Sequence, residues 1–290
     1  MTTERHYAEE DMGNIVSMEH VNVTIPDQGT ATLFYVLGLG FTRDPYMTVG
    51  LDNMWINVGE QQFHLPTRER GQVIPGHIGL VVPDLDRLQT RLKAVQDRLV
   101  GTRFTWASEG DHLAVTCPWG NRFRCHAPGG RFDDMALGIP YVEFPVRPDA
   151  ARGIARFYEV VMGAPAKVER EHGAPVARVA MGRNQWVDFR ETTEAIPPYD
   201  GHHIAVYVAN FSGPYGLLRE RDLIMEDVAG HQFRFKELVD PESGERLSVL
   251  EHEVRSMRHP MYRRALVNRN PVQMQSDYAR GQDAAGPFRG

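Results

Sequence analysis

The chain has little cysteine and no long apolar run, and each absence excludes a class of protein. Its two cysteines, Cys117 and Cys125, are too few for a disulfide framework. They flank the turn sequence Pro-Trp-Gly-Asn and could face each other across a hairpin, although two buried thiols are the simpler expectation. No apolar segment approaches the roughly 20 residues that span a bilayer, and the polar start lacks the apolar core of a secretory signal. We therefore expect a cytoplasmic protein with no membrane partner.

The chain also lacks an excess of basic residues. Its formal net charge is -6, with Arg and Lys scattered among Asp and Glu, so it offers no basic surface for nucleic acid. With 42% hydrophobic residues in 290, it can bury a substantial core in one large or two ordinary domains. A small-molecule substrate is the expected partner, and assembly into a homo-oligomer is left open.

What the sequence does contain is a repeated phrase. His-Val-Asn-Val-Thr-Ile-Pro-Asp at 20–27 returns as His-Ile-Gly-Leu-Val-Val-Pro-Asp at 77–84, each time followed by apolar residues at helical spacing. Similar openings stand at 139–149 and 202–210, and a Phe-Tyr pair recurs in the helical segments of the first and third copies. Short alternating runs follow each helix and predict antiparallel strands. The repeat predicts an α+β fold of four βαβββ units.

A Gly-rich, charged segment at 129–138 separates the second unit from the third and predicts a boundary near residue 133. We accordingly divide the chain into an N-terminal extension, two modules of two units each, and a C-terminal extension whose last fifteen or so residues we expect to be mobile. Their predicted limits are 1–17, 18–132, 133–254 and 255–290.

These phrases resemble the vicinal oxygen chelate superfamily, which includes glyoxalases, extradiol ring-cleaving dioxygenases, epimerases and antibiotic-resistance proteins. The resemblance covers about four fifths of the chain, in two fused modules. It implies that each pair of units forms a cup-shaped half-barrel around a divalent metal ion. In each unit, one inward position then lies on the first strand and one on the last, because alternation points every second side chain into the cup.

Offsets of 44 to 47 residues between the two inward positions agree across the four units. The first module presents His20, His64, His77 and Arg124, and the second presents Glu143, Asp188, His203 and Ser248. Three imidazoles could bind Fe(II), which we favour, or Zn(II), Ni(II), Mn(II) or Co(II). The predicted metal ligands are therefore His20, His64 and His77.

The second module offers the alternative set Glu143, Asp188 and His203, in which the neighbouring His202 replaces His203 if the strand register slips by one residue. Arg124 departs from the superfamily pattern, which has Glu at that position. Its guanidinium could instead hold an anionic substrate, or only brace the barrel by pairing with an acid. Alternation places His126 on the same face, so Arg124 and His126 are the predicted catalytic residues.

The expected function is that of a metal-dependent enzyme that chelates two neighbouring oxygens of a small substrate. A dioxygenase-type oxidoreductase is favoured because the four-unit chain is similar in size and layout to extradiol dioxygenases. A glyoxalase-like isomerase or lyase is the alternative, and a metal-free small-molecule binding or resistance protein is the alternative of another class.

Overall fold

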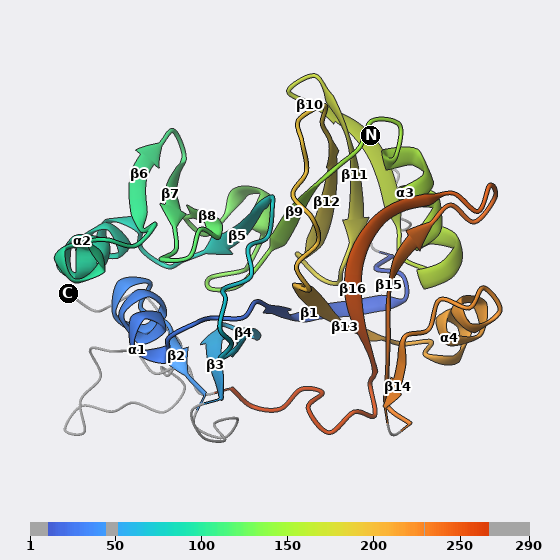
Figure 1. The fold of residues 1–290 in the computed structure, drawn as a ribbon, viewed down its shortest axis with the longest axis horizontal. Helices are drawn as coiled ribbons and strands as arrows, with labels where there is room; N and C mark the ends of the chain where they lie inside the picture. The colour runs from blue at the N-terminus through green and yellow to red at the C-terminus, as the bar shows by residue number, and fades with distance from the viewer. Residues whose placement is uncertain (1–10, 45–51, 229, 267–290) are drawn as a thin grey trace, which may run out of the picture.

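The computed structural model describes residues 11–44, 52–228 and 230–266, and in them the four expected units follow one another (Figure 1). The first unit contains β1 (Ile15–Asn22), α1 (Gln28–Ala31), the π-helix η2 (Thr32–Gly38), β2 (Thr42–Arg43), β3 (Asn53–Val58) and β4 (Gln61–Pro66). The second contains β5 (His77–Val81), α2 (Leu85–Gln96), the 3-10 helix η3 (Asp97–Leu99), β6 (Thr105–Glu109), β7 (His112–Thr116) and β8 (Arg122–His126).

A short 3-10 helix, η4 (Gly130–Phe132), leads into the second half of the chain. The third unit contains β9 (Tyr141–Val146), α3 (Ala151–Phe157), the π-helix η5 (Tyr158–Met162), β10 (Ala166–Glu171), β11 (Ala174–Ala180) and β12 (Trp186–Glu191). The fourth contains β13 (His203–Val208), α4 (Ser212–Arg219), β14 (Glu226–Val228), β15 (Gln232–Val239) and β16 (Arg246–Ser256).

The aspartate that ends the repeated phrase starts a helix. Asp27 accepts a hydrogen bond from the backbone N of Thr30 at 2.6 Å, and Asp84 accepts one from the backbone N of Arg87 at 3.0 Å. Both aspartates have extended backbone and cap the first turn of α1 and α2. The phrase therefore encodes a strand, a turn and a helix start.

The strands form two eight-stranded sheets. One has the order β14-β15-β16-β13-β1-β4-β3-β2, and the other β10-β11-β12-β9-β5-β8-β7-β6. The predicted α+β class, with four βαβββ units and two half-barrels, is confirmed. The first sheet joins the first unit to the fourth, through antiparallel pairing of β1 with β13. The second joins the second unit to the third, through β5 and β9.

This pairing contradicts the expectation that consecutive units share a half-barrel. Consecutive units instead pack through their helix-bearing faces, with α1 and α2 on one side of the molecule and α3 and α4 on the other (Figure 1). Aromatic cores fill both contacts. In the first half the core contains Phe34, Tyr35, Phe63 and Phe123, and in the second half Phe157, Tyr158, Phe189 and Phe235. We still propose a domain boundary near residue 133, because one aromatic core lies on each side of it. Each cup nevertheless contains strands from both halves of the chain.

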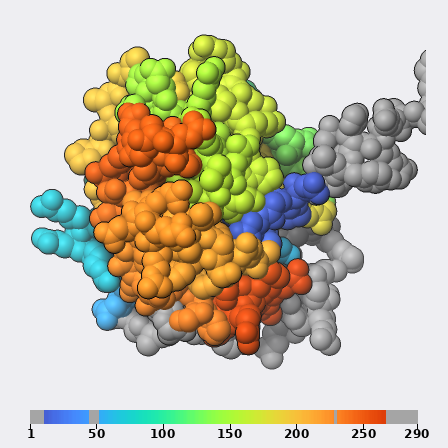
Figure 2. Space-filling model, turned by 90° about the vertical axis from the view of Figure 1, so that its right-hand side faces the viewer, coloured from blue at the N-terminus to red at the C-terminus, as the bar shows by residue number. Residues whose placement is uncertain are grey.

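Early residues of the chain consequently lie against late ones. Asn14 precedes β1, and its side-chain amide donates to the backbone carbonyls of Met162 at 2.9 Å and Asn210 at 3.1 Å. Figure 2 shows this beginning of the described chain, in blue, beside the third unit in yellow-green and the fourth in orange. The Gln185 side chain also joins the two sheets through hydrogen bonds with both backbone polar groups of Met18.

Three further expectations concern smaller features. Cys117 and Cys125 are buried free thiols, as expected, and burial raises the pKa of Cys125 to about 12. Among the residues that the structure describes, no helix is long and apolar enough to cross a membrane. The expected mobile end of the chain lies outside the described residues, as do residues 1–10 of the predicted N-terminal extension.

Gly76 tests the pairing of the second and third units. A Cβ atom added to this residue would lie 1.6 Å from the backbone oxygen of Glu143, so the segments that contain Gly76 and Glu143 could not approach each other as they do. We expect Gly76→Ala to lower the free energy of unfolding by more than about 2 kcal/mol in urea titrations. The control is Gly216→Ala in α4, where an added Cβ meets no atom within 4 Å. That change should be neutral or stabilise the protein by up to about 1 kcal/mol. Equal stability of Gly76→Ala and the wild type would contradict this pairing.

Candidate metal centre

Three imidazoles meet in the cup of the sheet that the first and fourth units share. His20 lies on β1, His64 on β4 and His203 on β13, and each residue offers a ring nitrogen within 4.8 Å of those of the other two. The arrangement follows from strand pairing, since β1 lies between β13 and β4. The ring centroid of His20 is 5.6 Å from that of His64 and 5.9 Å from that of His203.

Four ring nitrogens of this cluster lack hydrogen-bond partners. The buried Nε2 atoms of His20 and His203, and both ring nitrogens of His64, have none. A buried polar atom without a partner costs about 1–3 kcal/mol, so several at one point call for an explanation. Imidazole nitrogens that converge in this way fit a bound transition-metal ion, which would accept their lone pairs.

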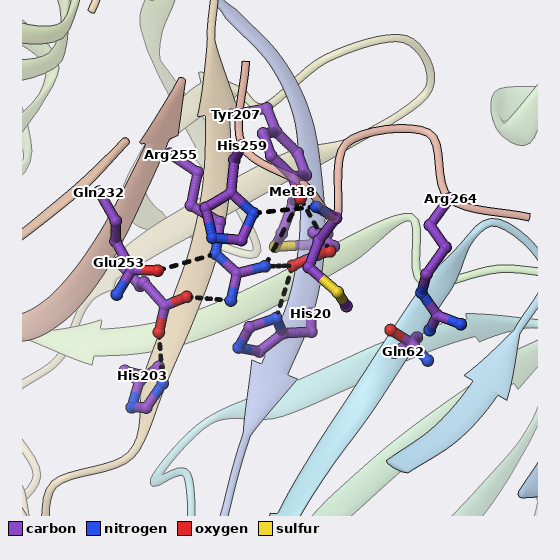
Figure 3. A network of polar contacts seen from close by, with 12 residues as sticks. Met18, His20, Gln62, His203, Tyr207, Gln232, Glu253, Arg255, His259 and Arg264 are labelled. Atoms are coloured by element: carbon purple, nitrogen blue, oxygen red, sulfur yellow. Dashed lines mark hydrogen bonds and ion pairs between the residues drawn. The ribbon is translucent and has the colours of Figure 1, made fainter. Parts of the chain in front are cut away.

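A carboxylate behind His20 sets its orientation. Glu19 Oε2 lies 2.9 Å from His20 Nδ1 and accepts a hydrogen bond from it. The proton of the neutral ring is then on Nδ1, which leaves the lone pair of Nε2 facing the cluster. The Tyr207 hydroxyl donates to Glu19 Oε1 at 3.0 Å, and the Arg255 guanidinium pairs with Oε2. Figure 3 shows this chain of contacts from Tyr207 and Arg255 to His20.

Glu253 on β16 lies beside the cluster. Its Oε2 atom lies 3.7 Å from Nε2 of His203, and its side chain is almost fully buried. Arg234 and Arg255 pair with its two oxygens, and Figure 3 shows Glu253 between Arg255 and His203. Glu251, two residues earlier on the same strand, lies 3.6 Å from Nδ1 of His203. The site therefore offers three imidazoles and a carboxylate that is fixed in place by two arginines.

The surroundings keep two of the imidazoles neutral. Burial, followed by the electrostatic effect of neighbouring His20, lowers the pKa of His64 to about 2. Burial and His20 likewise lower the pKa of His203 to about 2. A neutral imidazole has the lone pair that a metal ion needs, so near pH 7 both residues are in the binding form. His64 also stacks on Trp55, with ring centroids 3.9 Å apart, which fixes its plane.

The structure brings together part of each predicted ligand set. His20 and His64 are joined by His203 of the alternative set, whereas the predicted third ligand, His77, lies on β5 in the other sheet. The alternative set is also divided, because Glu143 and Asp188 lie on β9 and β12 of that other sheet. Both divisions arise because the first unit pairs with the fourth rather than with the second. His202 points away from the cluster, with Nδ1 2.7 Å from Asp200, so the register of His203 is the predicted one.

Sequence reasoning missed Glu253 and placed Ser248 at its position. A constant offset between inward positions fails in the fourth unit because β15 and β16 are 8 and 11 residues long and extend the closing hairpin. The register of the strands identifies Glu253, which pairs with Ala205, two residues beyond His203, just as His64 pairs with Asn22, two residues beyond His20. The alternating acids of Leu-Glu-His-Glu-Val at 250–254 were the available signal.

The cup of the second sheet holds the remaining predicted residues. His77 lies beside Glu143, with 3.3 Å between Nδ1 and Oε1, and Arg124 is on the neighbouring strand β8. Asp188 forms two hydrogen bonds with Arg178, at 2.9 and 2.8 Å, which is a structural ion pair. Arg124 is therefore in a different cup from His20 and His64, contrary to expectation.

His126, the other predicted catalytic residue, is also in the second sheet. Its Nε2 atom lies 3.0 Å from the Tyr141 hydroxyl, and its ring packs on Phe132. Together with Asp111 and His112 it forms a second group with metal-ligand spacing. The Asp111 side chain is 87% exposed and the His126 nitrogen already has a partner, so this group fits a metal less well than the three histidines do.

Comparison with known proteins gives likeness in structure without likeness in sequence. No protein-family model and no curated protein matches the chain. Glyoxalase I from Zea mays matches with a TM-score of 0.59 and 12% identity, over 83% of this chain and 92% of that one. A proposed dioxygenase from Bacillus subtilis subsp. subtilis str. 168 matches with a TM-score of 0.57 and 16% identity, over 84% and 86% of the two chains. At such identities the likeness concerns the fold alone.

Proposed function

Because the chain has the vicinal oxygen chelate fold, we propose that it is a divalent-metal-dependent enzyme of glyoxalase or dioxygenase type, and that its chemistry is that of an isomerase or lyase. The observation that supports this most is the set of imidazole nitrogens without partners in the cup of the first and fourth units. His20, His64, His203 and Glu253 would hold the ion. A bound divalent ion supplies Lewis-acid stabilisation of negative charge on substrate oxygens.

The number of metal-ligating side chains favours an isomerase or lyase. The size of the chain had suggested a dioxygenase. If all four side chains bind it, an ion would have less room for other ligands than with three, and two neighbouring substrate oxygens would take up that room. Ring-cleaving oxygenation needs further room for dioxygen, as the three-donor sites of non-haem iron oxygenases provide. The donor set of three imidazoles and one carboxylate suits Fe(II), Co(II), Ni(II) or Zn(II).

The protein's own groups would orient the site and manage protons. Glu19 keeps the proton of His20 on Nδ1, so Nε2 stays available to a ligand. Arg234 and Arg255 hold the Glu253 carboxylate against the cluster, where the oxygen that does not bind the ion would receive a proton from the substrate carbon and return it to the neighbouring atom. Burial of these groups excludes bulk water from that transfer.

A dioxygenase remains the second candidate, and the ion pairs of Glu253 favour it. If Glu253 stays with Arg234 and Arg255 and does not bind the ion, three imidazole donors remain and a further position opens. The two candidates differ in their use of oxygen, which an experiment can separate.

The test is a substrate panel with the metal-loaded protein. We expect metal-dependent exchange of the proton beside the carbonyl of 2-hydroxycarbonyl compounds, observed by NMR in heavy water and unchanged when oxygen is removed. Oxygen uptake with catechols and no proton exchange would establish the dioxygenase in its place. If neither activity depends on added Fe(II), Co(II), Ni(II) or Zn(II), the enzyme proposal fails and the metal-free binding protein is the better account.

A further inference from the structure

The cup of the second sheet encloses a cavity of about 600 Å³. Its lining includes His77, Arg122, Arg124, Glu143 and Arg190, and none of the three histidines of the metal centre. The small side chains of Ala107 and Ala114, which face each other on β6 and β7, leave space beside the arginines. This volume is within the range of small-molecule sites, and it lies on first and last strands, where the other cup carries its metal ligands.

Two arginines of this cavity have no acidic partner. Arg190 pairs with Glu143 and Glu171, so its charge is compensated. Arg122 donates only to the backbone carbonyls of Gly76 and Pro75, and Arg124 lies near the Tyr141 hydroxyl. Within the part of the chain that the structure describes, neither Arg122 nor Arg124 forms an ion pair.

The charges that act most strongly on His77 in this cup are positive. The lining also contains Glu109, Glu143 and Glu194, of which Glu109 and Glu194 are exposed to solvent, as are Arg122 and Arg124. The effect is visible at His77, whose pKa is lowered to about 3, first by burial and then by Arg124, Arg122 and Arg190. The cup is therefore suited to an anion.

His77 indicates what else the ligand carries. Its Nε2 atom is buried, has no hydrogen-bond partner, and belongs to a side chain that is 8% exposed. The nearest group to Nδ1 is the Glu143 carboxylate at 3.3 Å, which can only accept, so the single proton of the neutral ring belongs on Nδ1. Nε2 is then a hydrogen-bond acceptor without a donor. An amino group would be charged and repelled by the two guanidiniums, whereas a hydroxyl would not.

We propose that this cup binds a small 2-hydroxy acid, independently of metal, with its carboxylate on Arg124 and Arg122 and its hydroxyl donating to Nε2 of His77. Arginine suits the role because its planar fork matches a carboxylate. The site is separate from the metal centre, and the proposal does not depend on the proposed reaction.

The test is calorimetric titration of the full-length, metal-loaded protein with mandelate. Mandelamide serves as the probe without charge, and phenylacetate as the probe without the hydroxyl. We expect saturable binding of mandelate that Arg124→Gln weakens about ten- to a hundredfold, the scale of hydrogen bonds to charged groups. Arg98→Gln, at an exposed position on η3, removes the same charge elsewhere and should leave the affinity unchanged. Both control probes should bind at least about tenfold more weakly than mandelate.

Since a 2-hydroxy acid can also chelate a metal ion, the titration is repeated with His203→Ala, in which only the second cup should bind mandelate. Retention of binding there, and its loss in Arg124→Gln, supports the proposal. Equal affinity for mandelate and mandelamide, unchanged affinity in Arg124→Gln, disappearance of all binding in His203→Ala, or no saturable binding would each overturn it. None of these outcomes depends on whether the metal centre is catalytic.

Discussion

We expect alanine in place of His203 to remove stoichiometric metal from the protein, and alanine in place of His77 to leave it bound. His203 supplies one of three converging imidazoles, and His77 lies in the other sheet. Changes to groups behind a metal ligand already lower affinity about 10- to 100-fold, so loss of a ligand should lower it by more than about 100-fold. The measurement is metal content by mass spectrometry on protein purified without a His tag.

The two variants control for each other because both remove a buried imidazole at the start of a first strand. Thermal unfolding should show that both remain folded, so loss of metal in one cannot be attributed to general damage. Metal retained by His203→Ala and lost from His77→Ala would restore the ligand set predicted from the sequence.

A second large effect is expected from Glu253→Gln, which keeps the shape of the side chain and removes its charge. If Glu253 transfers the substrate proton, kcat on a substrate identified by the panel should fall by about 10²- to 10⁴-fold, the usual contribution of a general base. Gln keeps a carbonyl oxygen at this position and the three imidazoles remain, so the variant should bind metal more weakly but still detectably.

Glu237→Gln is the matched control for that variant. Glu237 lies on the neighbouring strand β15 and pairs with Arg246 near the surface, where an ion pair contributes little. Turnover in this control should equal that of the wild type. Full turnover in Glu253→Gln would exclude Glu253 as the group that transfers the proton.

Local features of this fold are readable from the sequence, because strand alternation and helix capping involve neighbouring residues. The phrase that begins at His20 encodes its strand and, through Asp27, its helix start. Which units share a sheet is not readable in the same way. Both faces of each unit are apolar enough to pack, and the choice between helix-side and cup-side partners is made by contacts such as Phe63 with Phe123, far apart in the sequence.

The candidate site shows the same limit. His20 and His64 belong to one unit, and their relation follows from the spacing within it. His203 was identified as an inward residue, but its partners depended on which units pair. Glu253 was missed because hairpin length differs between units, and spacing carries no information on that.

Pairing of the first unit with the fourth has a consequence for synthesis on the ribosome. His20 and His64 are translated early, but the strands that complete their cup end at Ser256, roughly 190 residues after Pro66. At about 5–20 residues per second, the nascent chain carries half a metal centre for roughly 10 to 40 s. The second cup, complete once β12 ends at Glu191, can close earlier. Ribosome-bound chains that stop after the third unit should therefore form the second cup and lack the complete histidine cluster, so the proposed metal centre is the last part of the molecule to mature.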